Sequence, residues 1–188
     1  MRINSTIQAL RERCPIFSER VFGAAEFNAL PEVINPESLP AAYVFTLNES
    51  PEELQRTENY FYQEITATIA VVVLVPTGDE RGQAGADLVE DCKEQIFKAI
   101  LSWSPVDDNK AIYEYSAYNL LRIVGGVMFV QLEFICTYAI NYEDTRQPDE
   151  IESQAGKLET INMDVDMIGK DNKPDGQIDV KARFKDLW

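Results

Sequence analysis

Residues 63–105 carry the clearest pattern in the chain, an apolar run followed by a turn and a helical stripe. Apolar and polar residues first alternate over 64–69, and the run then becomes continuously apolar over 69–75. Alternation is typical of a strand with one exposed face, whereas a continuous apolar run is typical of a strand covered on both faces. The pattern therefore predicts a strand over 60–75 that begins half exposed and ends buried.

The turn TGDERG leads into a predicted helix over 83–103, which Ser104 and Pro105 end. Apolar residues recur along it at three- and four-residue steps, and charged residues fill the other side, as in a helix that packs on a core. The apolar stripe consists of Leu88, Val89, Cys92, Ile96, Ile100 and Trp103. Glycine is a poor helix former, and one explanation for Gly85 in this helix is that the helix closely approaches the sheet there.

Weaker patterns fill the rest of the first 142 residues. They predict a short helix over 4–14 ended by Pro15, an irregular connection over 15–40, a strand over 41–47, a polar loop up to residue 59, and strands over 112–124 and 127–142. Gly125–Gly126 joins the last two strands, and Gly-Gly favours a hairpin because both turn positions tolerate positive φ.

The strand predicted over 127–142 is longer than the domain that holds it. Its residues, at about 3.3 Å each, span roughly 50 Å, whereas a compact globule of this chain length is about 40 Å across. The strand must therefore bend, end early or project, and a bulge is another way to absorb its length. A projecting hairpin would suggest contact with a neighbouring subunit.

The C-terminal part has a different pattern. Residues 143–157 are polar and acidic and predict a linker, after which alternation returns in TINMDVDMI and QIDVKARF. The intervening GKDNKPDG is rich in turn formers, so residues 158–188 are a candidate hairpin. Because a lone two-stranded hairpin is marginally stable in water, it must dock on its own sheet or on a neighbour.

Together these elements predict an α+β fold, with a mostly antiparallel β-sheet packed by one long helix and a short N-terminal helix, and with a C-terminal β-hairpin arm. The length of 188 residues suits one domain with an appendage. The predicted division is an α+β domain over 1–142, an acidic linker over 143–157 and the hairpin arm over 158–188.

Charge and residue usage narrow the possible functions. The chain has 32 acidic and 17 basic residues, a net charge of −15, and such a surface repels phosphate backbones and argues against tight, sequence-specific nucleic-acid binding. It is compatible with a passage through which DNA slides and with docking on a basic partner. The chain has no histidine, the commonest general base and zinc ligand, and its three cysteines are scattered without a CxxC pair. Neither a disulfide framework nor a zinc site is therefore predicted.

No targeting segment is expected. The N-terminus has no apolar stretch of the kind found in a signal peptide, and the run over 69–75 is far too short to span a bilayer. These features predict a protein that is made and kept in a reducing cytoplasm.

Three constellations resemble chemical sites, and each has a better structural explanation. Asp171–Asp179 spaces carboxylates like a calcium loop, but the third position is a lysine and the twelfth is not a glutamate. GDERGQAG occupies the place of a phosphate loop without its lysine, and Asp79 fits a helix cap instead. Glu64, Glu114 and Glu133 fall in strands, where an acid/base pair is possible in principle but solvated or interface carboxylates fit better. No catalytic residue, metal or cofactor is predicted.

From its central strand through DERGQAGADLVEDCKEQIFKAILSWSP to a long aromatic last strand, the chain resembles the tail terminator proteins of tailed bacteriophages. The matching features are the acidic-Arg-Gly opening at Asp79 to Gly82, a helix with Asp87 and a Leu/Ile stripe, and the exit at Trp103–Ser104–Pro105. The N-terminal helix and the LPAAYVF strand fit the same layout, so the resemblance covers roughly residues 1–142.

The resemblance implies a structural virion protein and not an enzyme. It implies a homohexamer ring on the last ring of the tail tube, which stops tube polymerisation and presents a surface to the head–tail connector. The implied partners are other copies of the chain, the major tail tube protein, the head–tail connector or stopper protein, and genomic DNA that passes through the lumen without sequence-specific binding; no membrane or cofactor is implied. The expected location is the tail–neck region of the virion, after assembly in the host cytoplasm.

Aromatic and apolar residues at the outer strand end and in the arm are the candidate interface. They are Tyr138, Ile140, Tyr142, Ile161, Met163, Val165, Ile178, Val180, Phe184 and Trp188. Overlong strands and a detached hairpin suit subunit exchange around a ring, so we expect the arm to dock on a neighbouring subunit or on the connector. Two alternatives stay open: another neck or tail-completion protein of the same fold, and a small ligand-binding or enzymatic α+β domain.

Overall fold

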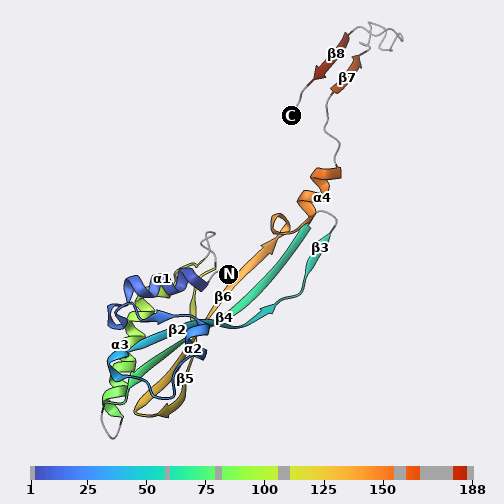
Figure 1. Ribbon diagram of the computed structural model, residues 1–188. Coiled ribbons are helices and arrows are strands. Elements are labelled where there is room, and N and C mark those ends of the chain that lie inside the picture. Colours follow the sequence, from blue (N-terminus) through green and yellow to red (C-terminus); the bar gives the residue numbers. More distant parts are fainter. Residues whose placement is uncertain are drawn as a thin grey trace. The chain divides into compact units, whose positions relative to one another are not determined.

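The computed structural model describes residues 3–57, 60–78, 82–105, 111–154, 160–165 and 180–185 (Figure 1). Contacts group the chain into two units, Met1–Asn141 and Tyr142–Trp188. The first unit contains the helices α1 (Ile3–Arg13), α2 (Ala24–Asn28) and α3 (Gln83–Ile100) and the 3₁₀ turns η1 (Pro15–Phe17) and η2 (Pro36–Ser38). Its strands are β1 (Val21–Phe22), β2 (Ala41–Pro51), β3 (Gln55–Thr57), β4 (Tyr60–Pro76), β5 (Glu114–Val124) and β6 (Val127–Asn141).

The six strands form one sheet in the order β1-β2-β4-β6-β5, and β3 pairs with β4 outside this path. β1 and β2 are parallel, and every other pairing in this sheet is antiparallel. The predicted fold class is confirmed: a mostly antiparallel sheet packed by one long helix and a short N-terminal helix. Since β4 and β6 are central, β5 is left at one edge.

Helices α1 and α3 cover one face of the sheet (Figure 1). Leu10 of α1 and Ile96 of α3 share a core cluster with Val71 and Val73 of β4. The predicted stripe of α3 is confirmed, with Val89, Cys92, Ile96 and Ile100 buried and Leu88 and Trp103 packed at the rim. Apolar burial on this face is the main source of stability in the domain.

A second, smaller cluster covers the other face of the sheet. Tyr43, Val72 and Phe129 of three neighbouring strands pack there against Phe27 and Ile34 of the connection before β2. Both faces of the inner half of β4 are therefore covered, which explains the continuous apolar run over 69–75.

Gly85 lies where α3 comes closest to the end of β4. A Cβ atom at this position would lie 2.8 Å from the carbonyl oxygen of Pro76, and the Gly85 amide donates a hydrogen bond to Thr77 O at 3.0 Å. The close approach proposed from the sequence is confirmed, because only a residue without a side chain fits against this backbone.

The β5–β6 hairpin turns at Gly125 and Gly126, whose φ values are 59° and 75°. Positive φ at both positions confirms the hairpin predicted from the Gly-Gly pair. β6 then pairs with β4 from Val127–Pro76 to Asn141–Tyr62 without a register shift. No bulge absorbs its length, so the long strand projects.

The projecting part, called the distal ribbon below, consists of the 49–57 segment of β2 and β3, residues 60–66 of β4 and residues 137–141 of β6. β4 and β6 run on beyond the layer formed by α1 and α3, with β3 alongside β4 (Figure 1). Residues 60–66 of β4 are all exposed or half-buried. The ribbon thus lacks the helix cover that buries the inner half of the same strands.

Two connections are more ordered than the sequence predicted. The predicted irregular connection over 15–40 contains β1, α2 and two 3₁₀ turns, and Arg20 Nε anchors it by donating to Pro40 O at 3.0 Å. The predicted polar loop before residue 60 is wrong over much of its length, because β2 continues to Pro51 and β3 follows it. These stretches of strand are exposed and polar, and they pair with β4 through the backbone. The sequence therefore shows no hydrophobic periodicity there.

The second unit contains the 3₁₀ turn η3 (Tyr142–Asp144), the helix α4 (Gln147–Gln154) and an antiparallel hairpin of β7 (Thr160–Val165) and β8 (Val180–Lys185). The predicted C-terminal hairpin is confirmed in these residues. α4 lies in the span that the sequence assigns to an acidic linker, and the predicted turn and calcium-like loop at 171–179 lie outside the described residues. In the described parts of both units, no helix is long and apolar enough to cross a membrane.

Candidate assembly surfaces

The edge strand β5 carries the largest set of exposed apolar side chains in the described chain. Its outer edge pairs with no described strand. The exposed apolar residues are Tyr115, Tyr118, Leu120, Leu121, Ile123 and Val124. Monomeric proteins rarely leave a long apolar edge strand open, because such an edge recruits other chains.

Two β-bulges explain why β5 exposes apolar residues on both faces. The register with β6 shifts between Tyr115 and Ala117 and again between Leu120 and Arg122, and each shift reverses the alternation of side chains. Tyr115 packs on Phe97 of α3 with ring centroids 4.8 Å apart. Arg122, beyond the second bulge, lies instead over Phe129 in the cluster on the opposite face.

The distal ribbon is held by polar contacts. The hydroxyls of Thr66 and Thr137 lie 3.0 Å apart, and Tyr138 donates to Glu49 Oε1 at 3.1 Å. The rings of Tyr60 and Tyr62 stack at 6.3 Å between centroids. Such bonds position strands but add little net stability where water competes for them.

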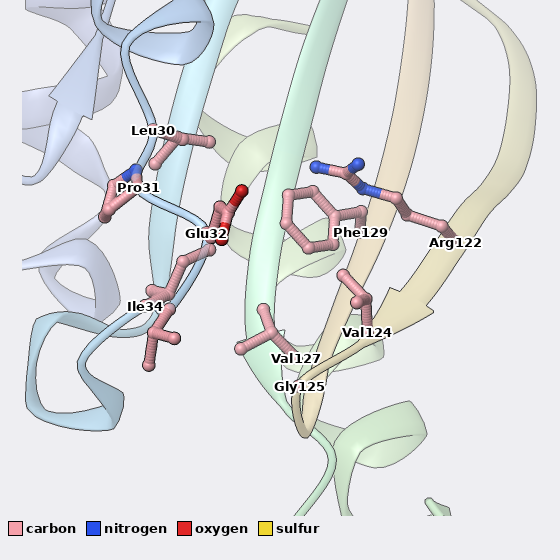
Figure 2. Close-up of a pocket in the computed structure, with 10 residues that line it drawn as sticks. Leu30, Pro31, Glu32, Ile34, Arg122, Val124, Gly125, Val127 and Phe129 are labelled. Atoms are coloured by element: carbon pink, nitrogen blue, oxygen red, sulfur yellow. The ribbon is translucent and has the colours of Figure 1, made fainter.

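A pocket opens beside the β5–β6 turn, with a volume of about 460 Å³. Leu30, Pro31 and Ile34 line one side, and Val127 and Phe129 line the other (Figure 2). Arg122 reaches over Phe129, with 4.3 Å between the guanidinium carbon and the ring centroid. Sequence reasoning missed this pocket; its one signal is an arginine placed alone in the apolar stretch LLRIVGGVMFV.

The interface residues predicted from the sequence fall in both units. Tyr138 and Ile140 lie half-buried on β6 in the distal ribbon, and Tyr142 begins η3. In the hairpin the register pairs Ile161 with Phe184, Met163 with Ala182 and Val165 with Val180. Ile178 and Trp188 lie outside the described residues. The interface role of the whole set stays a prediction.

Glu64 lies apart from the other two strand carboxylates. It pairs across the ladder with Ala139 near the outer strand end, whereas Glu133 pairs with Ala70, and Glu114 pairs with Ile135, two residues from Glu133. Glu133 accepts hydrogen bonds from Asn119 at 2.9 Å and Gln131 at 2.7 Å, and Glu64 accepts one from Tyr62 at 2.8 Å. Each has the environment of a surface carboxylate and not of an acid/base pair.

The buried thiols are poor nucleophiles. Burial raises the pKa of both Cys14 and Cys92 to about 12, so neither forms a thiolate near neutral pH. Within the described residues no group of histidine, cysteine or acidic side chains could hold a metal ion. The surface features that stand out on this domain are the exposed apolar residues of β5 and the pocket beside the β5–β6 turn.

Comparison with known proteins identifies the kind of assembly. The chain is a structural protein of a phage tail and, as such, of a virion. The model of the family described as "Phage tail terminator protein" matches residues 1–146, and the chain belongs to this family. The resemblance drawn from the strand–turn–helix segment is therefore confirmed.

No curated protein matches the chain. Among solved structures, a chain titled "Virion of native gene transfer agent (GTA) particle" is 12% identical, with 70% of this chain and 90% of that chain covered and a TM-score of 0.43.

Proposed function

We propose that the protein forms a homohexameric ring that caps the tail tube, ends tube polymerisation and joins the tail to the head–tail connector. Its partners are other copies of the chain, the major tail tube protein and the connector, and genomic DNA passes through the lumen without sequence-specific contacts. Family membership supports this role. The net charge of −15 suits a channel wall that does not retain DNA.

The observation that carries the proposal is the open edge of β5. A strand of eleven residues leaves six large apolar side chains exposed at the side of the sheet. In a ring of identical subunits such an edge is covered by the next subunit, and closure of the ring removes every free edge. A monomer would keep this surface in water.

The decisive experiment is electron microscopy of tails produced without this protein. We expect tubes of uncontrolled, excess length that lack attached heads, because nothing stops polymerisation. Tails of normal length that fail only to join heads would indicate another neck or tail-completion protein of the same fold. Tails of normal length with heads attached would refute the proposal altogether.

A variant tests the contribution of β5. Ile123→Lys places a charge in the open edge, and we expect ring association to weaken at least about tenfold, the effect of roughly 1.4 kcal/mol. Leu47→Lys is the matched control, because Leu47 is also an exposed apolar residue but lies on β2. Native mass measurement over a concentration series reports association, and equal effects of the two substitutions would argue against β5.

The arm is tested by truncation after Tyr142. We expect weaker assembly while the α+β domain stays folded, because the arm docks on a neighbouring subunit or on the connector. Circular dichroism checks the fold, and mass measurement with and without tail tubes checks assembly. Unchanged assembly would refute a role of the arm.

A further inference from the structure

Arg122 is a cation without a carboxylate partner in the described part of the chain. The three salt bridges there involve Lys93, Lys98 and Arg146, and Glu32 lines the same pocket without pairing with Arg122. The guanidinium lies over Phe129 at the mouth of an apolar pocket (Figure 2). Val33 at the same pocket is 85% exposed, an unusual degree for valine. The site is suited to an apolar side chain that has a carboxylate next to it.

The opposite end of the domain presents that chemistry. The connection between β2 and β3 carries Glu52, Glu53 and Leu54, all of them exposed, and Leu54 keeps 44% of its surface in water. This connection is held in place by the ribbon, because the Glu52 amide donates to Glu64 O at 2.8 Å and Gln63 Nε2 donates to Glu52 O at 3.0 Å. A leucine beside two carboxylates is therefore displayed on a fixed backbone.

The two surfaces cannot meet within one copy. The pocket contains Phe129, near the start of β6, and the 52–54 connection lies beside Gln63, which pairs with Ile140 near the end of β6. Eleven residues of unbroken strand separate these positions, or about 36 Å at 3.3 Å per residue. A contact between them must join two copies, head to tail, and a head-to-tail contact closes into a ring when its rotation permits.

We propose that Leu54 of one copy enters the Arg122 pocket of the next copy and that Glu53 pairs there with Arg122. The inference rests on the proposed ring and names the surfaces that build it. Leu54 and the pocket walls remove apolar area from water, while the Glu53–Arg122 pair fixes register and speeds association of two copies that otherwise repel each other through their net charge. In the proposed ring the edge of β5 is also covered by the next copy. This edge adjoins the pocket, because Arg122 and Val124 belong to both.

Cross-linking between singly substituted copies tests the contact directly. Val33→Cys and Leu54→Cys copies are mixed and oxidised mildly; the native Cys14, Cys92 and Cys136 are buried and do not compete. We expect a disulfide between the two kinds of copy and almost none between copies of one kind, because a head-to-tail contact brings unlike positions together. Leu47→Cys, at 43% exposure against 44% for Leu54, is the matched control.

Charge exchange gives an independent readout that does not depend on introduced cysteines. Arg122→Glu should weaken association at least about tenfold at low salt, and adding Glu53→Arg to the same chain should restore most of the loss. Both side chains are exposed, and circular dichroism checks that the fold is kept when Arg122 no longer covers Phe129. Glu12→Arg on α1 is the matched control, because it restores the same net charge at an exposed position elsewhere. Rescue by Glu53→Arg and not by Glu12→Arg requires that positions 53 and 122 meet.

The possible outcomes distinguish a failure of the proposed contact between Leu54 and the Arg122 pocket from a failure of the proposed ring. Rings whose Val33→Cys and Leu54→Cys copies cross-link no better than the Leu47→Cys control, or whose Arg122→Glu defect is not rescued, refute the contact and leave the ring standing. Alkylation of Val33→Cys that is blocked by tube protein, or that is unblocked by truncation after Tyr142, without any cross-link to Leu54→Cys copies assigns the pocket to that partner and refutes the contact. A chain that stays monomeric in solution and on tail tubes refutes both.

Discussion

The two halves of the β4–β6 pair use one backbone ladder for different purposes. Over 69–75, β4 is buried on both faces, whereas over 60–66 every residue of the same strand is exposed or half-buried. Apolar burial stabilises the inner half, while exposed hydrogen bonds, which contribute little net stability, hold the distal ribbon. The inner half therefore keeps the domain folded, whereas the ribbon adds exposed length to it.

The largest expected effect comes from removing a buried side chain in the inner half, compared with removing one in the ribbon. Ile69→Ala in the inner half should lower the free energy of unfolding by about 3 kcal/mol, because it leaves a cavity in a packed core. Ile140→Ala in the ribbon should cost less than about 1 kcal/mol, since Ile140 is half-buried. Urea unfolding of both variants measures the difference, and equal losses would contradict the division into two halves.

The next largest effect concerns the contact of α3 with the inner half. Gly85→Ala should destabilise the domain by about 1–3 kcal/mol, because the new methyl group would lie 2.8 Å from Pro76 O. Helix propensity alone predicts the opposite sign, a gain of about 1 kcal/mol. The control is Ala86→Gly, the reverse exchange at the exposed neighbouring position, which should cost about 1 kcal/mol. A stabilised Gly85→Ala variant would show that the helix has room to move.

A smaller effect tests the hydrogen bond between α1 and the core. Thr6 Oγ1 and Tyr113 Oη lie 2.7 Å apart and are both buried, so Tyr113→Phe should cost about 1–2 kcal/mol at neutral pH by leaving the threonine hydroxyl without its partner. The effect has a pH signature. Burial raises the pKa of Tyr113 to about 12 in the folded domain, from 10.0.

A phenol with a raised folded-state pKa contributes stability that is fully present below pH 10 and is lost as the pH rises toward 12, because the unfolded chain ionises first. Stability of the parent chain should therefore fall over this interval more steeply than that of the Tyr113→Phe variant. Denaturant unfolding at a series of alkaline pH values measures both curves. Parallel curves would mean that Tyr113 titrates alike in the folded and unfolded states.

The smallest expected effect lies in the ribbon. Tyr138→Phe removes the hydrogen bond to Glu49 but keeps the ring, and the loss should be below about 0.5 kcal/mol because both groups can turn to water. Thermal unfolding followed by circular dichroism measures it. A loss as large as that of Tyr113→Phe would show that the ribbon is part of the cooperative core.

Long, periodic segments made much of this fold predictable. The alternation that turns into a continuous run located β4 and its burial, the three- and four-residue steps located α3, and Gly125–Gly126 located the β5–β6 turn. In each case the order of residues along the chain reflects which side of the strand, helix or turn faces the core.

The remaining features depend on tertiary neighbours. β3 is three exposed polar residues whose only reason to be extended is pairing with β4, and β1 is two residues long. Sequence periodicity predicted a strand at β5 but not that it lies at an edge, since edge and centre differ in partners and not in pattern. The pocket was equally hidden, because Phe129 and Ile34 are brought together only by the folded sheet.

The unbroken register between β4 and β6 has a mechanical consequence. Their hydrogen bonds lie across the strand direction, and the pairing runs from Tyr62–Asn141 to Pro76–Val127 without a bulge. A pull on one strand of the ribbon, with the other strand anchored, therefore loads the whole ladder in shear, so that many bonds share the force and none can be peeled away alone. A subunit held at its ribbon would therefore transmit tension directly into its own core.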